Sequence, residues 1–191
     1  MNIRTSVQLT IQDTRTGKMI HHHRRRSFPS HSYLRGFLHI LFAQMYQGSM
    51  GTLDTGNVSR AVVQHANNLD IKAAISVSLF GLVIGKGSDA VLVTNYKLQT
   101  QCLQGSALDQ LLHGVVTFDD YALYNNSLRF RANRTFTNDS GLEIALRECG
   151  IYCRATVTPY YFCIVRDILP EVIWLQPGQT ITLRYKISVT A

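Results

Sequence analysis

Residues 176–190 read QPGQTITLRYKISVT and combine a turn with a strand whose two faces differ. Pro177 and Gly178 are typical of a tight turn. After this turn, apolar residues occupy every second position: Ile181, Leu183, Tyr185, Ile187 and Val189. Because successive side chains of a strand point to opposite faces, the alternation predicts a half-buried strand of an antiparallel sheet.

The same kind of pattern continues upstream through the second half of the chain. Residues 137–141, TNDSG, supply the Asn and Gly of a hairpin turn between two further runs. Short β-type runs separated by turn residues are expected at 58–66, 73–84, 115–118, 127–137, 142–153, 160–168 and 179–190. We also expect a turn or two of helix at 94–100 and 106–114. Strands in sequence without long intervening helices predict a mainly β fold, an antiparallel β-sandwich or jelly-roll-like body over residues 50–191.

The first 49 residues have a different pattern and are predicted to form an arm. Val7, Leu9 and Ile11 alternate with polar residues before the turn sequence DTRTGK at 13–18, which predicts a β-hairpin. Ser30 is the expected N-cap of an amphipathic helix that ends near residues 47–49. The apolar residues at helical spacing are Tyr33, Leu34, Phe37, Leu38, Leu41, Phe42 and Met45.

Positive charge is concentrated in this arm. The formal net charge is +7; residues 1–40 contain seven basic residues and one acid, whereas the remaining 151 residues contain twelve and eleven. The densest segment is IHHHRRRSF at 20–28. Alternate histidines of an extended chain could share a metal ion, but no third ligand is suggested nearby, so we expect no metal and no cofactor. The arginines suit either a docking hinge or, less favoured, contact with nucleic acid.

No motif in the chain indicates an enzyme. The segment GLVIGKGSDA at 81–90 has the wrong glycine spacing for a phosphate-binding loop and no following helix. Asp119 and Asp120 are neighbours and would point apart in a strand, and His65 and His113 have no nucleophile motif to serve. The longest apolar window, 73–85, is 13 residues and too short to span a bilayer as a helix. The N-terminal residues lack the apolar core of a signal peptide. We expect a non-enzymatic protein with no membrane partner.

The chain contains four cysteines without the repeated close spacing of a zinc site. If residues 147–154 and 160–167 form a hairpin, Cys153 and Cys163 would face each other and could form a disulfide after oxidation outside the cell. Buried reduced thiols are the alternative for all four cysteines.

The segments RFRANRTFTNDSGLEIALRECGIYCR (129–154) and YFCIVRDILPEVIWLQPGQTITLRYKISVTA (161–191) resemble a family of tailed-phage structural proteins. In that family, a strand ending in R.FTN.SG leads to an E.GLY strand, then to L.RD.L and PGQTLTVTYTISV. The residues of this chain that match are Arg134, Phe136, Thr137, Asn138, Ser140, Gly141, Glu148, Gly150, Ile151, Tyr152, Arg166, Asp167, Pro177, Gly178, Gln179 and Thr180.

The resemblance extends over most of the chain, although its motifs are turn and strand signatures. The segment LFGLVIGKGSDAVLVTNYKLQT (79–100) is similar to that family's Gly-rich turn, and RRRSFPSHSYLRGFLHILFAQ (24–44) to its basic helix. Ile151 and Cys153 depart from the usual surroundings of the LY pair. The resemblance implies a virion component and does not assign its position in the particle.

Together these patterns predict a structural subunit of a tailed phage, made in the host cytoplasm and located in the virion. A capsid decoration, cement or minor capsid role is favoured, and a head–tail connector or tail accessory position is the alternative. Expected partners are further copies of the chain and virion proteins such as the major capsid protein. The residues expected to dock are Arg24, Arg25, Arg26, Phe28, Tyr33, Leu34, Phe37 and Leu41.

Overall fold

A computed structural model describes residues 2–19, 26–30, 33–124, 127–156 and 158–190. Its larger sheet contains β1 (Asn2–Asp13), β2 (Arg26–Ser30), β6 (Leu112–His113), β7 (Thr117–Tyr124), β8 (Ser127–Thr137) and β11 (Gln179–Thr190). The strand order is β2-β1-β11-β8-β6, and β7 pairs with the same edge of β8 as β6 does, nearer the start of β8. All of these pairings are antiparallel.

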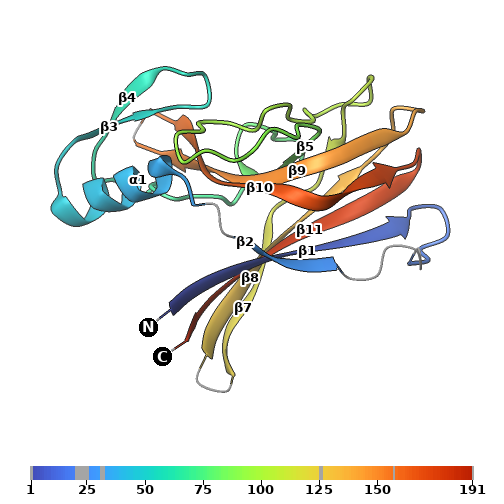
Figure 1. Ribbon diagram of the computed structural model, residues 1–191, viewed down its shortest axis with the longest axis horizontal. Helices are drawn as coiled ribbons and strands as arrows, with labels where there is room; N and C mark the ends of the chain where they lie inside the picture. The colour runs from blue at the N-terminus through green and yellow to red at the C-terminus, as the bar shows by residue number, and fades with distance from the viewer. Residues whose placement is uncertain (1, 20–25, 31–32, 125–126, 157, 191) are drawn as a thin grey trace.

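A smaller sheet lies against this one and consists of β5 (Gly81–Gly85), β9 (Ile144–Ala155) and β10 (Tyr160–Leu175), in the order β10-β9-β5. The helix α1 (Arg35–Tyr46) packs against β10 and against a two-stranded sheet of β3 (Met50–Leu53) and β4 (Ser59–Val62). Figure 1 shows that β1, β7, β8 and β11 extend beyond the smaller sheet, toward the two chain termini. The predicted fold, an antiparallel β-sandwich with one helix, is confirmed.

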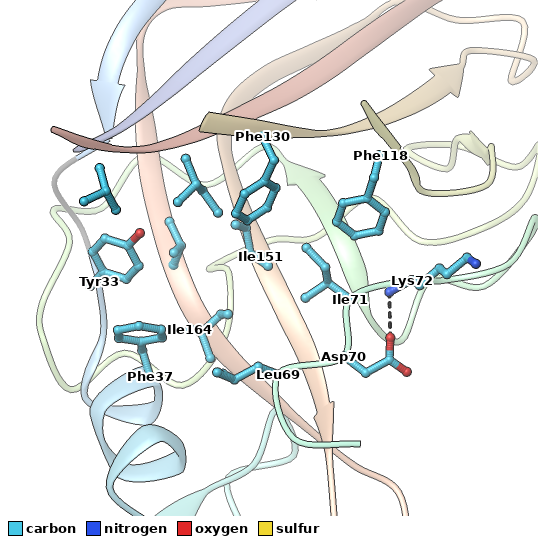
Figure 2. Close-up of a pocket in the computed structure, with 13 residues that line it drawn as sticks. Tyr33, Phe37, Leu69, Asp70, Ile71, Lys72, Phe118, Phe130, Ile151 and Ile164 are labelled. Carbon is cyan, nitrogen blue, oxygen red and sulfur yellow. Dashed lines mark hydrogen bonds between the residues drawn. The ribbon is translucent and has the colours of Figure 1, made fainter. Parts of the chain in front are cut away.

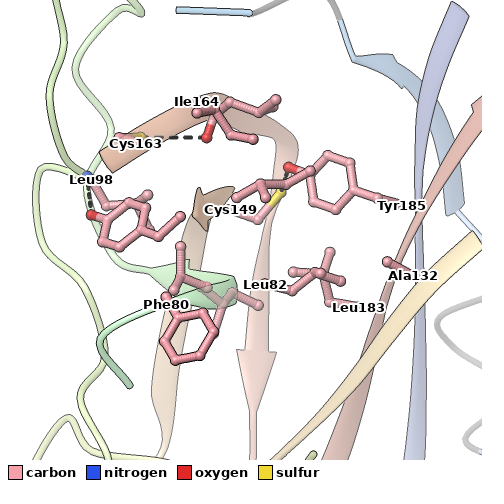
Figure 3. Packing of buried hydrophobic residues seen from close by; sticks show 14 of the residues in the cluster. Phe80, Leu82, Leu98, Ala132, Cys149, Cys163, Ile164, Leu183 and Tyr185 are labelled. Atoms are coloured by element: carbon pink, nitrogen blue, oxygen red, sulfur yellow. Dashed lines mark hydrogen bonds between the residues drawn. The ribbon is translucent and has the colours of Figure 1, made fainter. Parts of the chain in front are cut away.

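The core lies between the two sheets. Leu183 and Tyr185 of β11 are fully buried, as the alternation in residues 181–189 predicts. The hydroxyl of Tyr185 lies 3.3 Å from Cys149 Sγ and donates to Asp167 Oδ2 at 2.9 Å, which joins β11 to β9 and β10. Figure 3 shows Cys149 pointing toward Tyr185 in this layer. A core of this kind requires no disulfide, because burial of apolar surface supplies most of the driving force.

The first strand is an integral part of the larger sheet. β1 pairs with β11 along its whole length, from Asn2 opposite Thr190 to Asp13 opposite Gln179, and with β2 on its other side. The predicted turn at 13–18 is present, with Asp13 N–H donating to Lys18 O. The division of the chain at residue 49 stays a prediction, but in space the first strand belongs to the same sheet as the last.

Several local predictions were wrong. Ser30 is not the N-cap: α1 begins at Arg35 after Leu34, while Ser30 ends β2 and its hydroxyl donates to the buried Asp167 Oδ2 at 2.8 Å. Residues 94–100 contain a turn and bends, and residues 106–114 contain a turn, a bridge and the short strand β6, in place of helix. Of the run 73–84, only residues 81–84 are strand. Among the described residues, no helix combines the length and hydropathy needed to cross a membrane.

Candidate functional site

An apolar groove of about 470 Å³ lies where the larger sheet extends past the smaller one. We call this the apolar groove, and Figure 2 shows the side chains that line it. Its lining combines residues from both ends and from the middle of the chain: Tyr33, Phe37, Leu69, Asp70, Ile71, Lys72, Phe118, Phe130, Ile151, Ile164, Val165, Ile187 and Val189.

One wall of the groove belongs to the extended end of the larger sheet. Phe130 of β8 is opposite Ile187 of β11. Phe118 of β7 is opposite Ala132 of β8. These positions continue the core-facing alternation of Leu183 and Tyr185, but here the smaller sheet no longer covers them. As a result, 44% of Phe118 and 36% of Phe130 stay exposed.

The facing wall is formed by the smaller sheet and the start of the helix. The ring centroids of Tyr33 and Phe37 lie 4.7 Å apart, and Tyr33 Oη is 2.7 Å from Thr5 Oγ1. Tyr33 also forms a β-bridge with Val165, and Leu34 N–H donates to Ile164 O. These contacts attach the residues before α1 to β10 and leave the two rings at the groove.

The rim of the groove carries a charged side chain that already has a partner. Asp70 Oδ2 lies 2.6 Å from Arg154 Nη2, and its Oδ1 accepts the Lys72 N–H at 2.8 Å, the bond drawn in Figure 2. With this carboxylate engaged, the groove offers mainly apolar surface. Such a surface suits the apolar side chains of a binding partner better than a polar substrate.

A second apolar surface is formed by α1 together with Met50 of β3. We call it the helix surface: a hollow of about 400 Å³ lined by Leu38, His39, Leu41, Phe42, Met45 and Met50. Leu38 is 60% exposed and Met45 76% exposed. Phe42 stacks on Tyr46 at 5.1 Å. The helix thus buries Gly36, Ile40 and Ala43 and directs larger apolar side chains outward.

The predicted docking residues fall into separate groups. Arg24 and Arg25 lie outside the described residues, as do His21, His22 and His23. The backbone of Arg26 begins β2, but its side chain is not among those that the structure describes. Leu34 is buried, and Phe28 packs partly buried opposite Val7, so both serve the core.

Tyr33 and Phe37 line the apolar groove, and Leu41 lies in the helix surface. Sequence reasoning missed the sheet side of the groove, namely Phe118, Phe130, Ile187 and Val189. The alternating pattern placed Ile187 and Val189 on the apolar face of the last strand, and nothing local shows that the facing sheet ends before reaching them.

Arg134 and Asn138 of the segment 129–154 act as buried structural contacts. Arg134 is 1% exposed and donates to the backbone carbonyls of Gly114 and Leu82, each at 2.9 Å. It also donates to the backbone carbonyls of Phe80, Ala74 and Val77. Burial lowers the pKa of its guanidinium to about 10. Asn138 donates to Leu142 O and Leu175 O, and its Oδ1 accepts the Ser140 N–H. These side chains connect loops to strands.

The carboxylates and histidines considered in the sequence are likewise dispersed. Asp119 accepts from Arg131 Nη1 at 3.2 Å and from Asn133 Nδ2 at 2.8 Å on the outer face of the larger sheet. His113 is buried in the core, where its Nε2 lies 3.0 Å from Cys102 O and its ring contacts Phe136 edge-on. In the part of the chain that the structure describes, no group of three or more metal-ligating side chains comes together.

The expected pairing of Cys153 with Cys163 was wrong. The hairpin of β9 and β10 is present, but Cys153 is opposite Phe162, and Cys163 is opposite Tyr152. Neighbouring residues of a strand point to opposite faces, so the one-residue difference in register directs the two thiols to opposite sides of the sheet. All four cysteines are free and buried.

The chain was compared with protein-family models, with curated proteins and with solved structures, and none of the three comparisons gave a match.

Proposed function

We propose that this protein is a non-enzymatic structural subunit of a tailed-phage particle, most suitably a capsid decoration, cement or minor capsid protein that acts through protein–protein contacts. The observation that carries the proposal is the apolar groove, whose aromatic and aliphatic lining remains open to solvent in the isolated chain. The phage-like motifs of residues 129–154 and 161–191 support the same assignment.

The occupant that we propose for the groove is an apolar segment of a neighbouring virion protein, such as the major capsid protein. Aromatic anchors in a largely apolar recess are typical of the residues that dominate binding energy at protein interfaces. Phe118 and Phe130 would supply such anchors from the sheet, and Tyr33 and Phe37 from the opposite wall.

The helix surface extends the interface around α1. Large exposed apolar residues are unusual in this number on one short helix of a soluble monomer, and a partner surface would remove them from water. In a symmetric particle, each copy would contribute a modest area, and repetition over many copies would make the whole assembly stable. The protein would be made in the host cytoplasm and retained in the virion.

Mass spectrometry of gradient-purified particles, from cultures that produce the chain, tests this assignment directly. We expect the chain to be present in a fixed ratio to the major capsid protein and to remain after repeated banding. Its absence from particles, while it accumulates in the soluble fraction of the same lysate, would contradict the proposal.

Two matched variants test the helix surface. Leu38→Glu places a charge in this surface, and Leu108→Glu places the same charge at a site of similar exposure, 60% against 66%, outside it. Both should fold, because neither side chain belongs to the core. Only Leu38→Glu should lower the number of copies per particle; equal incorporation of the two variants would remove the helix surface from the interface.

A groove variant completes the set. Phe118→Glu introduces a charge into the lining from a side chain that is 44% exposed. We expect reduced incorporation together with an unchanged circular dichroism spectrum. Normal incorporation of this variant would show that the groove is not where the particle holds the protein.

A further inference from the structure

The outer face of the larger sheet carries a concentration of positive charge. In β1, β8 and β11, the residues that alternate with the core-facing ones point away from the smaller sheet. We call this the basic face, and its basic members are Arg4, Arg129, Arg131, Arg184 and Lys186. Arg4 is exposed and the other four are partly exposed.

Strand register brings these residues together from three distant segments. Arg4 is opposite Ser188, which is opposite Arg129. In the next outward row, Lys186 is opposite Arg131. With strands about 4.8 Å apart and outward rows about 6.8 Å apart, the five cations fall within a patch of roughly 10 by 14 Å.

Hydrogen bonds orient part of this patch. Arg184 Nε donates to Asn133 Oδ1 at 2.5 Å, and its Nη1 donates to Gln8 Oε1 at 3.2 Å. Of the described side chains at the outward positions of these rows, Asp119 is the one that is acidic, and it accepts hydrogen bonds from Arg131 and Asn133. Among the side chains that the structure describes, the patch therefore carries five positive charges against one negative charge. The Asp120 side chain lies outside the described part of the structure.

The neighbours of these cations indicate what kind of partner the patch fits. Across β1, β11, β8 and β7, the remaining positions of the three rows are Ser6, Gln8, Thr117, Ala122, Asn133 and Ser188. Protein interfaces usually have an apolar or aromatic core, and these rows contain no large apolar residue. In protein–DNA complexes, phosphate oxygens are contacted by Arg, Lys, Ser, Asn and Gln side chains, and these are the residue types present here. Among the described residues that have a register partner in these three rows, no aromatic ring is present on which an unpaired base could stack.

We infer that the basic face binds the phosphate backbone of a duplex nucleic acid, without reading its sequence. This function is additional to the docking proposed above and uses a different surface, since the groove and the core-facing residues lie on the other side of the larger sheet. Phosphate contacts by Arg and Lys release counterions from the duplex, so the affinity would fall steeply with salt.

Fluorescence anisotropy with a short labelled DNA duplex, over 50 to 200 mM salt, tests the inference. The test variant is Arg4→Gln with Lys186→Gln. Its control is Arg15→Gln with Lys18→Gln, which removes the same charge from exposed residues in the turn at the other end of β1. We expect the test variant to lower the slope of log K against log salt by about 2 and to weaken binding at low salt by about tenfold or more. The control should bind as the unmodified chain does.

Four outcomes would overturn the inference. The first is that the full chain shows no salt-dependent binding to the duplex. The second is that the control variant weakens binding as much as the test variant does, which would assign binding to overall charge. The third is loss of binding only when Arg24, Arg25 and Arg26 are changed to Gln. The fourth is unchanged duplex binding by the test variant together with lower incorporation into particles, which would assign the face to an acidic protein. Circular dichroism of each variant verifies its fold.

Discussion

Glu148 and Arg166 form a buried ion pair, with Arg166 Nε 2.8 Å from Glu148 Oε2. The Arg166 side chain is 2% exposed and the Glu148 side chain is 0% exposed. Glu148 also accepts the backbone N–H groups of Gly87, Gln99 and Thr100. Arg166 donates to Asp89 O at 3.0 Å and to Asn95 Oδ1 at 2.9 Å. The pair thereby attaches the long connection between β5 and β6 to the outer face of the smaller sheet.

Removal of one partner should strongly destabilise the fold. Arg166→Met leaves Glu148 buried without its cation, and we expect the free energy of unfolding to fall by about 3 to 5 kcal/mol. Urea denaturation followed by circular dichroism measures this change. Asp109→Asn is the control, because Asp109 pairs with Lys86 where both side chains are partly exposed, and its loss should cost less than about 1 kcal/mol. Similar losses in the two variants would contradict the structural role of Glu148 and Arg166.

Gly150 should not tolerate a side chain. A Cβ atom at this position in β9 would lie 2.4 Å from the backbone oxygen of Val165 in the neighbouring strand, and a backbone atom cannot rotate away. Gly150→Ala should therefore destabilise the protein by roughly 2 kcal/mol or more in urea denaturation. At Gly51, also in a strand, the nearest atom to an added Cβ is 3.8 Å away, so Gly51→Ala should be neutral or slightly stabilising. A neutral Gly150→Ala variant would be inconsistent with the pairing of β9 and β10 described above.

His113 should make stability depend on pH in mildly acidic solution. Burial, together with the charge of Arg134, lowers the pKa of His113 from 6.5 to about 4. Between these values the unfolded chain binds a proton that the folded protein does not, so the free energy of unfolding should fall as the pH drops from 6.5 toward 4. Below about pH 4 both states are protonated and this contribution no longer grows.

The size of the His113 effect can be isolated by substitution. The pKa difference corresponds to roughly 3 kcal/mol over that interval, and His113→Gln should remove most of it. A smaller dependence of the same sign should remain, because burial and Arg35 also lower the pKa of His39. Urea denaturation of both proteins across this pH range provides the measurement, and parallel curves would exclude His113 as the source.

The four thiols should be unreactive in the folded protein. Burial raises the pKa of Cys102 and of Cys153 to about 12 and raises the pKa values of Cys149 and Cys163 well above 9.0. At pH 8, roughly one such thiol in ten thousand is ionised, so alkylation should be slow until denaturant is added and should then reach all four cysteines. A Cys153–Cys163 peptide found by non-reducing mass spectrometry of aged material would disprove the strand register.

Much of the β architecture was predictable because its signals are local. Alternating residues and turn-forming residues identified the strands at 127–137 and 179–190 with the bounds that the structure has. The helix was also predicted, but not its start, since Ser30 is as suitable for an N-cap by type as it is for the bond to Asp167 that it makes. Residues 73–80 are apolar enough for a strand, yet the carbonyls of Ala74 and Val77 accept from Arg134 instead of from a neighbouring strand.

The sequence by itself determined the strands at 127–137 and 179–190 and the apolar face of the second of them, because alternation and turn-forming residues are local signals. Only the tertiary structure decided the partners and the register of those strands, because these depend on contacts between residues far apart in the chain. Phe118, Phe130 and Ile187 meet in one groove only because the larger sheet extends past the smaller one. Arg4 lies near Lys186 only because β1 pairs with β11. By sequence position, the net positive charge belongs to the N-terminal arm and the body is nearly neutral. Strand pairing nevertheless brings cations from both regions together on one face of the larger sheet.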